Sequence, residues 1–516
     1  MYRPTLLLSL LVPWSIGSAA ASKKAQKTAD TSRPNVIIII ADDLGYGDIG
    51  CYGAKGVSTP NIDRLAAHGL RLTDSHAAAS TSTPSRYALL TGEYPWRRNG
   101  TDVAPGDAAM IIKPHQYTIA DMFRSKGYRT CAIGKWHLGL GDVTGAQDWN
   151  APLPASPADI GFDNHYIMAA TADRVPCVFI RDGQVAGYDP SAPIEVSYTH
   201  NFPGEPTARE HPELCYNQRS SHGHDCSIIN GIGRIGYMKG GGKALWQDEN
   251  IADSITAYAV DYIKDHADRP FFMYFATNDV HVPRFPHERF RGKSGMGMRG
   301  DAIVQFDWSV GQIMDTVEKL GLADNTIILL TSDNGPVTDD GYDDRADELL
   351  GTHSPQGPWR SGKYSAFEGG TAVPLIVRWK GHVAEGSSSD ALMSLVDIYG
   401  SMRSLINATL PKGCAMDSED HLDALLGKCH DGRDNVIGMA SNRTLTVRTK
   451  QWKYIEPSDG PAKITWGPDI ETGNNPQPQL YDISTDIREE NNVALKHPQV
   501  VFDLQNVLRR ERARGF

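Results

Sequence analysis

Residues 35–41 form an apolar run, Val-Ile-Ile-Ile-Ile-Ala after a single Asn. Strands covered on both faces read as continuous β-branched runs, whereas half-exposed strands alternate polar and apolar residues. The run therefore predicts a central strand of a sheet that is covered on both of its faces.

Further strand-like and helix-like segments alternate after this run. Strands are predicted at 129–133, 270–276, 326–331 and 374–379, and helices at 62–68, 118–126, 301–320 and 392–405. The alternation predicts an α/β protein with a large mixed, mostly parallel sheet between helices. The stretch 141–250 is interpreted as loops and inserts over the sheet.

The C-terminal part departs from this pattern. Residues 444–447 and 452–455 are typical of hairpin strands, and residues 498–512 of a helix. We therefore divide the folded chain into a larger α/β domain, 33–434, and a smaller α+β domain, 435–516.

The N-terminus has the features of a secretory signal. Arg3 precedes an apolar run at 6–12 that is too short to span a bilayer, and small residues at 18–21 provide a cleavage site. We expect residues 1–21 to be a signal peptide, 22–32 a linker, and the protein to be exported without a membrane span. No cysteine follows the small residues, so a bacterial lipid anchor is not indicated.

The charge of the chain limits its binding partners, and its cysteines limit the possible disulfide bridges. The formal net charge is −11, without a dense Lys/Arg block, which argues against nucleic acid or an anionic membrane as the main partner. Seven cysteines is an odd number, so at least one is free or pairs between chains. Cys215 with Cys226, and Cys414 with Cys429, are close enough in sequence to close small loops, but spacing alone establishes neither bridge.

Oxygen-bearing side chains follow two predicted strands. Asp42 and Asp43 come directly after the first strand, and Asp333 and Asn334 follow the strand at 326–331. Each pair alone is typical of a helix cap or tight turn. Because both lie at the carboxyl ends of strands of one sheet, a site for Ca²⁺ or Mg²⁺ is the better interpretation.

The segment 82–92 has two interpretations. Ser82 is suited to cap a helix that Gly92 closes, with Pro84 in its first turn. Alternatively, the helix N-terminus and Arg86 form an anion site into which the Ser82 side chain points.

Ser82-x-Pro84-Ser85-Arg86, followed by Leu-Thr-Gly at 90–92, resembles the signature of type I sulfatases of the alkaline-phosphatase-like superfamily, in the variant with Ser instead of Cys at the first position. Residues 127–137, Gly-Tyr-Arg-Thr-Cys-Ala-Ile-Gly-Lys-Trp-His, are similar to a second signature of that family. The family's other motifs occur in order at 42–43, 281–283, 332–335, 362–363 with 368–370, and 480–482. The resemblance covers nearly the whole mature chain.

The resemblance implies hydrolysis of sulfate monoesters. In this family the first signature residue, here Ser82, is oxidised to formylglycine, whose hydrate attacks sulfur and later expels sulfate. It further implies Ca²⁺, with Mg²⁺ as the alternative, held by Asp42, Asp43, Asp333, Asn334 and the modified Ser82. The implied roles of the remaining residues concern proton transfer and charge. Arg86 and Lys135 would fix the formylglycine hydroxyls, His137 would open the hemiacetal, His281 would protonate the leaving alcohol, and Lys363 would contact the sulfate.

The leaving group is expected to be a carbohydrate, first a sulfated galactose or N-acetylgalactosamine of host or algal glycans, by resemblance to bacterial carbohydrate sulfatases. Candidate sugar-binding residues lie outside the shared motifs; they are Asp173, Arg174, His224 and Arg360. Surface salt bridges explain each of them equally well. Trp96, Trp246 and Trp359 are candidate stacking platforms, although Trp is more often a core residue.

Two other functions stay open. One is a phosphodiesterase or phosphonate monoester hydrolase of the same superfamily. The other is a non-catalytic binder of sulfated glycans in which Ser82 remains unmodified.

Serine at position 82 resembles the form modified by an oxygen-independent radical maturase of bacteria, because the aerobic route needs a thiol. A helix beginning near Pro84 would bury the backbone that the maturase must reach, so modification would precede export. We therefore expect a periplasmic or secreted enzyme of an anaerobic bacterium.

Overall fold

The computed structural model describes residue 1, residues 33–467 and residues 469–515. The expected signal peptide and linker, apart from Met1, lie outside the described residues. Within those residues, no helix combines the length and apolarity needed to cross a membrane. All seven cysteines are described as free thiols, so neither loop-closing bridge is present.

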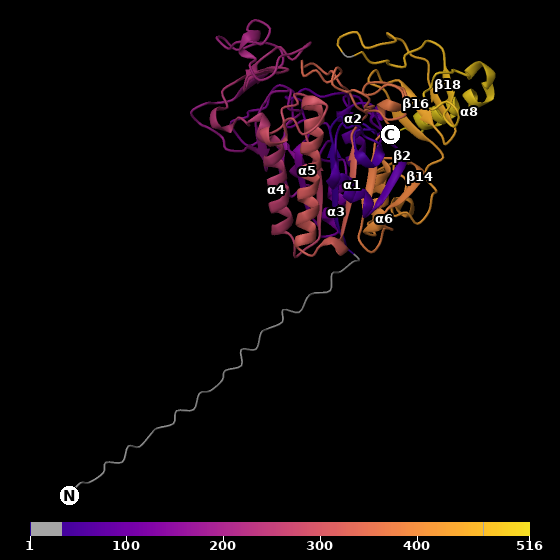
Figure 1. Ribbon diagram of the computed structural model, residues 1–516, viewed down its shortest axis with the longest axis horizontal. Coiled ribbons are helices and arrows are strands. Elements are labelled where there is room, and N and C mark those ends of the chain that lie inside the picture. Colours follow the sequence, from indigo (N-terminus) through magenta and orange to yellow (C-terminus); the bar gives the residue numbers. More distant parts are fainter. Residues whose placement is uncertain (2–32, 468, 516) are drawn as a thin grey trace.

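A ten-stranded mixed sheet forms the centre of the fold (Figure 1). Its strands are β1 (Asn35–Ala41), β2 (Leu70–His76), β3 (Arg129–Lys135), β4 (Asn164–Met168), β5 (Phe179–Arg181), β6 (Gln184–Val185), β11 (Phe271–Ala276), β12 (Thr326–Ser332), β13 (Leu375–Arg378) and β14 (Ser387–Ser394). Their order is β14-β2-β13-β12-β1-β11-β3-β4-β5-β6. The neighbours from β12 to β4 are all parallel, which confirms the mostly parallel mixed sheet.

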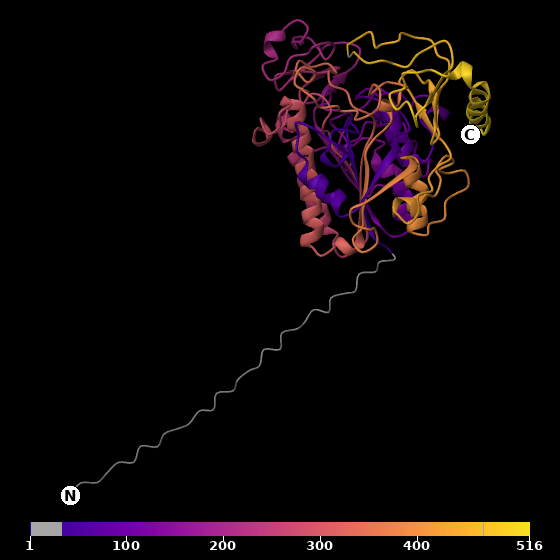
Figure 2. The same ribbon diagram turned by 45° about the vertical axis from the view of Figure 1, so that its right-hand side comes forward.

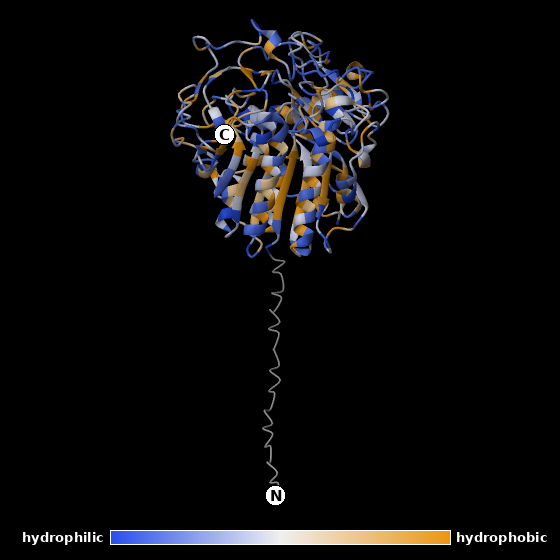
Figure 3. Ribbon diagram, turned by 60° about the vertical axis from the view of Figure 1, so that its left-hand side comes forward, coloured by the Kyte–Doolittle hydropathy of each residue, from blue (hydrophilic) through white to orange (hydrophobic). Residues whose placement is uncertain are grey.

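Helices cover both faces of this sheet. In one layer α5 (Gly297–Lys319) contacts α1 (Pro60–Ala67) and α4 (Ile251–Asp265), and in the other α2 (Ser82–Thr91) contacts α3 (Ile119–Ser125) and α6 (Asp397–Leu405). Every residue of β1 is buried, as its apolar run predicts. Figure 3 shows apolar strands behind helices whose outer faces are hydrophilic. This arrangement confirms the α/β class.

Three predictions about the elements need correction. Residues 392–394 belong to β14, because they pair with residues 74–76 of β2, and α6 begins only at Asp397. The sequence analysis did not predict β2, whose polar residues interrupt the apolar pattern. The stretch 141–250 contains more than loops, since β4 extends the main sheet beside β3. It also holds short strands: β7 (Glu195–Ser197), β8 (Ile228–Ile229), β9 (Ile232–Gly233) and β10 (Tyr237–Lys239).

The C-terminal part forms a second, antiparallel sheet, as the hairpin pattern predicts. Its elements are β15 (Val436–Met439), β16 (Leu445–Arg448), β17 (Trp452–Ile455), β18 (Gln479–Asp482) and α8 (Pro498–Ala513), preceded by the short α7 (Leu422–Leu425). Figure 2 shows this part, in yellow, beside the upper end of the main sheet. Its apolar residues pack against Ala88 of α2. The C-terminal sheet therefore supports the helix that begins with Ser82.

A buried ion cluster joins the two sheets. The carboxylate of Glu368 accepts hydrogen bonds from Lys453 of β17 at 2.6 Å and from Arg448 of β16 at 3.0 Å. Glu368 follows Lys363 in the same loop, so the C-terminal sheet also fixes the loop that carries this lysine.

Candidate active site

The site lies at the carboxyl ends of the parallel strands. Because β12, β1, β11 and β3 are neighbours in the sheet, side chains that follow them meet at one edge. These side chains are Asp42 and Asp43 after β1, Asp333 and Asn334 after β12, His281 after β11, and Lys135 as the last residue of β3.

Ser82 is the first residue of α2 and is 3% exposed. Its Oγ lies 3.0 Å from Nδ1 of His137. Nε2 of that ring lies 2.9 Å from the carbonyl oxygen of Ala104, which only accepts, so Nε2 carries the proton and Nδ1 accepts from the Ser82 hydroxyl. Burial and the nearby Lys135 hold the pKa of His137 well below its usual range. Thr81 occupies the N-cap position, so of the two interpretations of this segment the one in which Ser82 caps the helix does not apply.

Two buried cations lie between carboxylates beside Ser82. Arg86 donates from Nε and Nη2 to Oδ2 of Asp333, at 3.0 and 2.7 Å. Lys135 donates to Oδ1 of Asp42 at 2.6 Å. Burial raises the pKa of Asp42 well above its ordinary value and lowers that of Lys135. The cationic groups of Arg86 and Lys135 are thus held in a region closed to water, where positive charge acts strongly on a developing anion.

Asp43 is the centre of a second ionic group. Its Oδ2 accepts from Nζ of Lys363 at 2.7 Å, and its Oδ1 from Nδ2 of Asn334 at 2.8 Å. Burial opposes the charge on Asp43, but Lys363, Lys135 and the hydrogen bond from Asn334 together outweigh this effect and lower its pKa. Lys363 also donates to Asp340 at 2.8 Å, and Asp340 accepts from the Tyr364 hydroxyl. The sequence analysis missed Asp340. Its local sign in the sequence is the Asp-Asp pair at 339–340, which follows Asp333 and Asn334.

This arrangement fits a divalent cation. Asp42, Asp43 and His281 each present a ligand atom, and these atoms lie within 4.8 Å of one another. Oδ2 of Asp42 and Oδ1 of Asn334 are buried without a hydrogen-bond partner among the described residues, a costly state that a cation would relieve. Both oxygens of Asp333 already accept hydrogen bonds, from Arg86 and from the backbone amide of Asp43, as both oxygens of Asp43 do from Lys363 and Asn334. His281, expected as an acid, lies within the ligand cluster.

A cavity of about 100 Å³ opens at Ser82 and His137. Asp173, Arg174 and His224 line it, as does Lys363. Oδ2 of Asp173 lies 2.9 Å from Nε2 of His224, and its carboxylate accepts from Nη1 of Arg174 at 3.1 and 3.2 Å. Burial opposes the charge on Asp173, yet Arg174, His281 and His224 together hold its pKa well below the usual range. The cavity thus offers fixed acceptors and donors at its wall.

Arg360 is placed outside this cavity. Its guanidinium donates from Nε and Nη2 to the carboxylate of Glu471, at 2.8 Å each, and lies 3.9 Å from the ring centre of Phe367. Arg360 therefore ties the loop between β17 and β18 to the core and does not line the cavity, and its role in sugar binding stays a prediction.

Trp466 lines the cavity together with Tyr364, and the sequence analysis missed it. It is 52% exposed, and its ring packs edge to face on Tyr364 with centroids 5.2 Å apart. Aromatic side chains are common in the walls of ligand sites.

The three tryptophans expected to stack on a sugar do not line this cavity. Trp246 and Trp359 are buried in apolar clusters, and Trp96 stacks on Tyr94. Trp466 had no local signal beyond being a lone Trp in a polar loop.

Fold and site together are those of a hydrolase of the alkaline-phosphatase-like class, because a buried hydroxyl at a helix start shares a cavity with His281 and Lys363, and Lys363 contacts the carboxylate of Asp43 at the sheet edge. The sequence profile of the sulfatase family matches residues 34–408. The chain belongs to the sulfatase family and is a sulfuric ester hydrolase.

Relatives cover almost the whole chain. An N-acetylgalactosamine-6-O-sulfatase of Bacteroides thetaiotaomicron is 50% identical over 506 residues, which span 97% of this chain and 98% of the relative. Human arylsulfatase A is 30% identical over 495 residues, spanning 92% and 87%. A solved structure from work on glycosaminoglycan metabolism by Bacteroides thetaiotaomicron has a TM-score of 0.91 at 51% identity, covering 93% of this chain and 100% of the other. A phosphonate monoester hydrolase of Agrobacterium radiobacter shares the fold, with a TM-score of 0.58 at 18% identity over 93% and 96% of the two chains.

Proposed function

We propose that this sulfatase removes the 6-sulfate of N-acetylgalactosamine from glycosaminoglycan-type glycans. The observation that carries the proposal is the 50% identity, over nearly the full length of both chains, to a relative named for that activity. The cavity walls support a sugar substrate, because Asp173 accepts hydrogen bonds from sugar hydroxyls while Arg174 and His224 provide donors. Of the two sugars expected from the sequence, galactose and N-acetylgalactosamine, we therefore propose N-acetylgalactosamine.

The nucleophile is proposed to arise from Ser82 by oxidation to formylglycine. Formylglycine, as its hydrate, supplies a hydroxyl that attacks sulfur and a second hydroxyl that allows sulfate to leave. His137 is positioned to accept a proton from the group at position 82, because its Nδ1 is the free acceptor of a neutral ring. Arg86, one turn after Ser82 on α2, donates to the carbonyl of Lys135, and Lys135 pairs with Asp42, so both cations are held in the strand-end cluster beside the start of α2.

A bound sulfate ester would bring its negative charge close to Lys363 and His281. Both line the cavity, and Lys363 holds its ammonium between Asp43 and Asp340. Burial and Lys363 hold the pKa of His281 well below its usual range. The negative charge of a bound sulfate ester favours the protonated ring, from which Nε2 would protonate the leaving sugar oxygen.

Asp42, Asp43 and Asn334 are proposed to hold Ca²⁺, with Asp333 and the modified residue 82 completing the set. Ca²⁺, when bound there, supplies a Lewis acid that polarises a sulfate oxygen. The support is the pair of buried oxygens without partners on Asp42 and Asn334.

Maturation and location are proposed from the position of Ser82. All of α2 is buried, so a radical maturase acting on Ser82 needs the unfolded chain. Together with the signal-like N-terminus, this supports modification in the cytoplasm and export to the periplasm or the medium of a bacterium.

The decisive experiment measures sulfate release from matured enzyme on the 6-sulfate, the 4-sulfate and the 3-sulfate of N-acetylgalactosamine, and on galactose 6-sulfate. Preferred release from the 6-sulfate supports the proposal, and preference for another position overturns it. Turnover of a 4-nitrophenyl phosphate diester ahead of every sulfate ester would favour the phosphodiesterase alternative. Intact-mass analysis tests the non-catalytic alternative, because conversion of Ser82 to formylglycine removes two hydrogens.

A further inference from the structure

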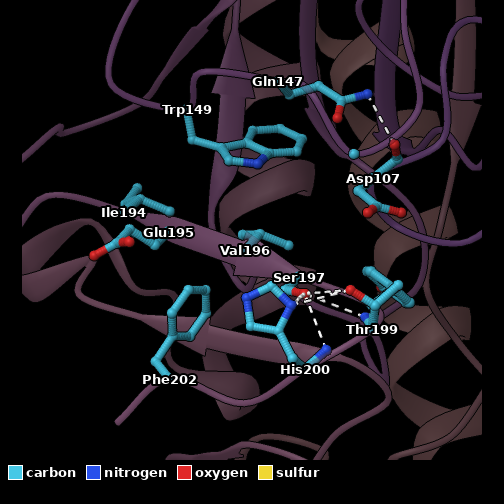
Figure 4. Close-up of a pocket in the computed structure, with 12 residues that line it drawn as sticks. Asp107, Gln147, Trp149, Ile194, Glu195, Val196, Ser197, Thr199, His200 and Phe202 are labelled. Atoms are coloured by element: carbon cyan, nitrogen blue, oxygen red, sulfur yellow. Dashed lines mark hydrogen bonds between the residues drawn. The ribbon is translucent and has the colours of Figure 1, made fainter.

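The positive charge needed to bind a sulfate ester distinguishes the catalytic cavity from a larger one. The cavity of about 350 Å³ shown in Figure 4 is lined by the acidic residues Asp107 and Glu195, and no Lys or Arg is among the described residues that line it. The catalytic cavity, by contrast, is lined by Arg174 and Lys363. A sulfate ester is therefore attracted to the catalytic cavity, and its binding depends on where the Lys363 ammonium is held.

Two carboxylates hold this ammonium. Nζ of Lys363 donates to Oδ2 of Asp43 at 2.7 Å and to Oδ2 of Asp340 at 2.8 Å. The side chains of Lys363 and Asp340 are 5% and 7% exposed, and that of Asp43 is fully buried, so solvent ions screen these contacts little. The two acceptors differ in one respect. Asp43 belongs to the group of residues with metal-binding geometry, and Asp340 lies outside that group.

Asp340 is itself held by a neighbouring aromatic residue. Its Oδ1 accepts a hydrogen bond from the hydroxyl of Tyr364 at 2.8 Å, which leaves Oδ2 for Lys363. The Tyr364 ring packs in turn on Trp466. Each oxygen of Asp340 therefore has its own donor, and the carboxylate is fixed in direction.

The loop that carries Asp340 is fixed by Arg284, which is 1% exposed. The guanidinium donates to the carbonyl oxygens of Val337 and Thr338, at 3.0 and 2.7 Å, shortly before Asp340 in the chain. It also donates from Nε to the carbonyl of Val280, in the loop after β11, at 2.9 Å. One buried arginine thus holds the loops after β11 and β12 together, so Asp340 is a rigid anchor for Lys363.

A cation at Asp43 would change the balance between the two anchors. A divalent cation bound to this carboxylate repels the ammonium next to it, because the two have charge of the same sign. Without Asp340, the cation and Lys363 would compete for one carboxylate. With Asp340, the ammonium keeps a fixed partner that the cation does not need.

We propose that Asp340 is the positioning residue for Lys363, and that it keeps the ammonium at the wall of the catalytic cavity while Asp43 binds a divalent cation. The inference rests on the proposed role of Asp43 as a ligand. It adds a residue that acts on the sulfate through Lys363 and on the cation through Asp43.

Calorimetric titration of the full-length protein with Ca²⁺, in the absence of sugar, tests the effect on the cation. Asp340→Asn is expected to weaken Ca²⁺ binding by about tenfold, because the ammonium is left to compete for Asp43. In a Lys363→Met background the competitor is gone. There the same substitution is expected to cost only about threefold, through the lost attraction between the Asp340 charge and Ca²⁺. Equal losses in the two backgrounds, or no loss with the lysine present, overturn the proposal.

Asp339→Asn is the matched control, because Asp339 is the preceding acid in the same loop and accepts from the Ser221 hydroxyl at 2.9 Å. It is expected to leave the Ca²⁺ affinity unchanged within about twofold. Tyr364→Phe is a second variant, which keeps every charge and releases Oδ1 of Asp340; it is expected to weaken Ca²⁺ binding in the same direction. Where thermal unfolding shows that Asp340→Asn does not fold, an unchanged affinity in Tyr364→Phe overturns the proposal.

The position of the ammonium is tested in matured enzyme with saturating Ca²⁺ and N-acetylgalactosamine 6-sulfate. Asp340→Asn is expected to raise KM by about tenfold with a smaller effect on kcat, and Asp340→Glu, which retains the carboxylate, to recover most of the loss. An unchanged KM would overturn the proposal. Failure of the matured parent on this sugar counts against the proposed function and leaves the Ca²⁺ titrations as the test of Asp340. A parent that binds no Ca²⁺ overturns the metal ligands and this inference together.

Discussion

Oγ of Ser82 and Nδ1 of His137 lie 3.0 Å apart, and the carbonyl of Ala104 holds the opposite nitrogen of the ring. The backbone thus selects the tautomer of His137 that accepts a proton from position 82. Because both residues are almost fully buried, this relationship depends on the packing of α2 and the loop after β3.

The first prediction concerns Ser82. Ser82→Ala is expected to abolish sulfate release while costing only about 1 kcal/mol of stability, because one buried hydrogen bond is lost. Sulfate release and thermal unfolding measure the two effects. Ser82→Cys, expressed with a maturase that accepts cysteine, serves as the control and should be active. An active Ala variant would contradict the assigned nucleophile.

The second prediction concerns Ca²⁺. Added Ca²⁺ should raise the melting temperature, since a ligand at 100 times its Kd stabilises by about 2.7 kcal/mol. Chelation should lower the melting temperature and the activity together. Asp43→Asn should lose the Ca²⁺-dependent shift, and Asp142→Asn should retain it. An equal shift in both variants would place the ion elsewhere.

The third prediction concerns Trp466. Trp466→Ala should lower kcat/KM on the sulfated sugar by about tenfold, which corresponds to about 1.4 kcal/mol of lost contact. The loss should fall mainly on KM, because the ring lines the cavity and carries no group that transfers a proton. Trp466→Phe should retain most of the activity. Phe502→Ala, a similarly exposed aromatic on α8, is the control. Unchanged KM in Trp466→Ala would remove the residue from the site.

The fourth prediction concerns the pH dependence of stability. Asp307 accepts hydrogen bonds from the backbone amides of Asn61 and Ile62 at the start of α1, and burial raises its pKa to about 6. The folded state therefore binds this proton more tightly than the unfolded chain. The free energy of unfolding contributed by Asp307 should therefore be largest below about pH 4. It should decrease as the pH rises from about 4 to about 6, by on the order of 3 kcal/mol in total.

Asp307→Asn is expected to flatten this part of the profile, because the amide does not titrate. Denaturant unfolding of both proteins across the same pH range gives the difference. A difference that is constant with pH would show that Asp307 keeps an ordinary pKa.

The fifth prediction concerns Arg360. Because it pairs with Glu471 outside the cavity, Arg360→Ala should leave KM unchanged, whereas Arg174→Ala should raise KM strongly. A double-mutant cycle of Arg360 and Glu471 should give a coupling energy of about 0.5 kcal/mol, as for other partly exposed ion pairs. A raised KM in Arg360→Ala would restore it to the sugar site.

Local patterns in the sequence were sufficient for the centre of the fold and for the strand-end residues. The apolar run at 35–41 predicted a buried strand, since an uninterrupted β-branched segment has no polar face to expose. Asp42 and Asp333 follow parallel strands, and parallel strands end at one edge, so the sequence placed both at the same edge of the sheet, whereas the structure shows that β1 and β12 are neighbours there. The sulfatase signature around Ser82 added the family, which the comparisons confirm.

Contacts between distant segments were decided only by the tertiary structure. β2 carries polar residues and was not predicted, because its stability comes from pairing with β13 and β14, which lie some 300 residues later. The same reason explains why Arg360 was assigned to the sugar and Trp466 was missed. Arg360 is held by Glu471, and Trp466 reaches the cavity on a loop of the C-terminal sheet. A side chain's partner depends on chain segments far away in sequence, and local spacing carries no information about them.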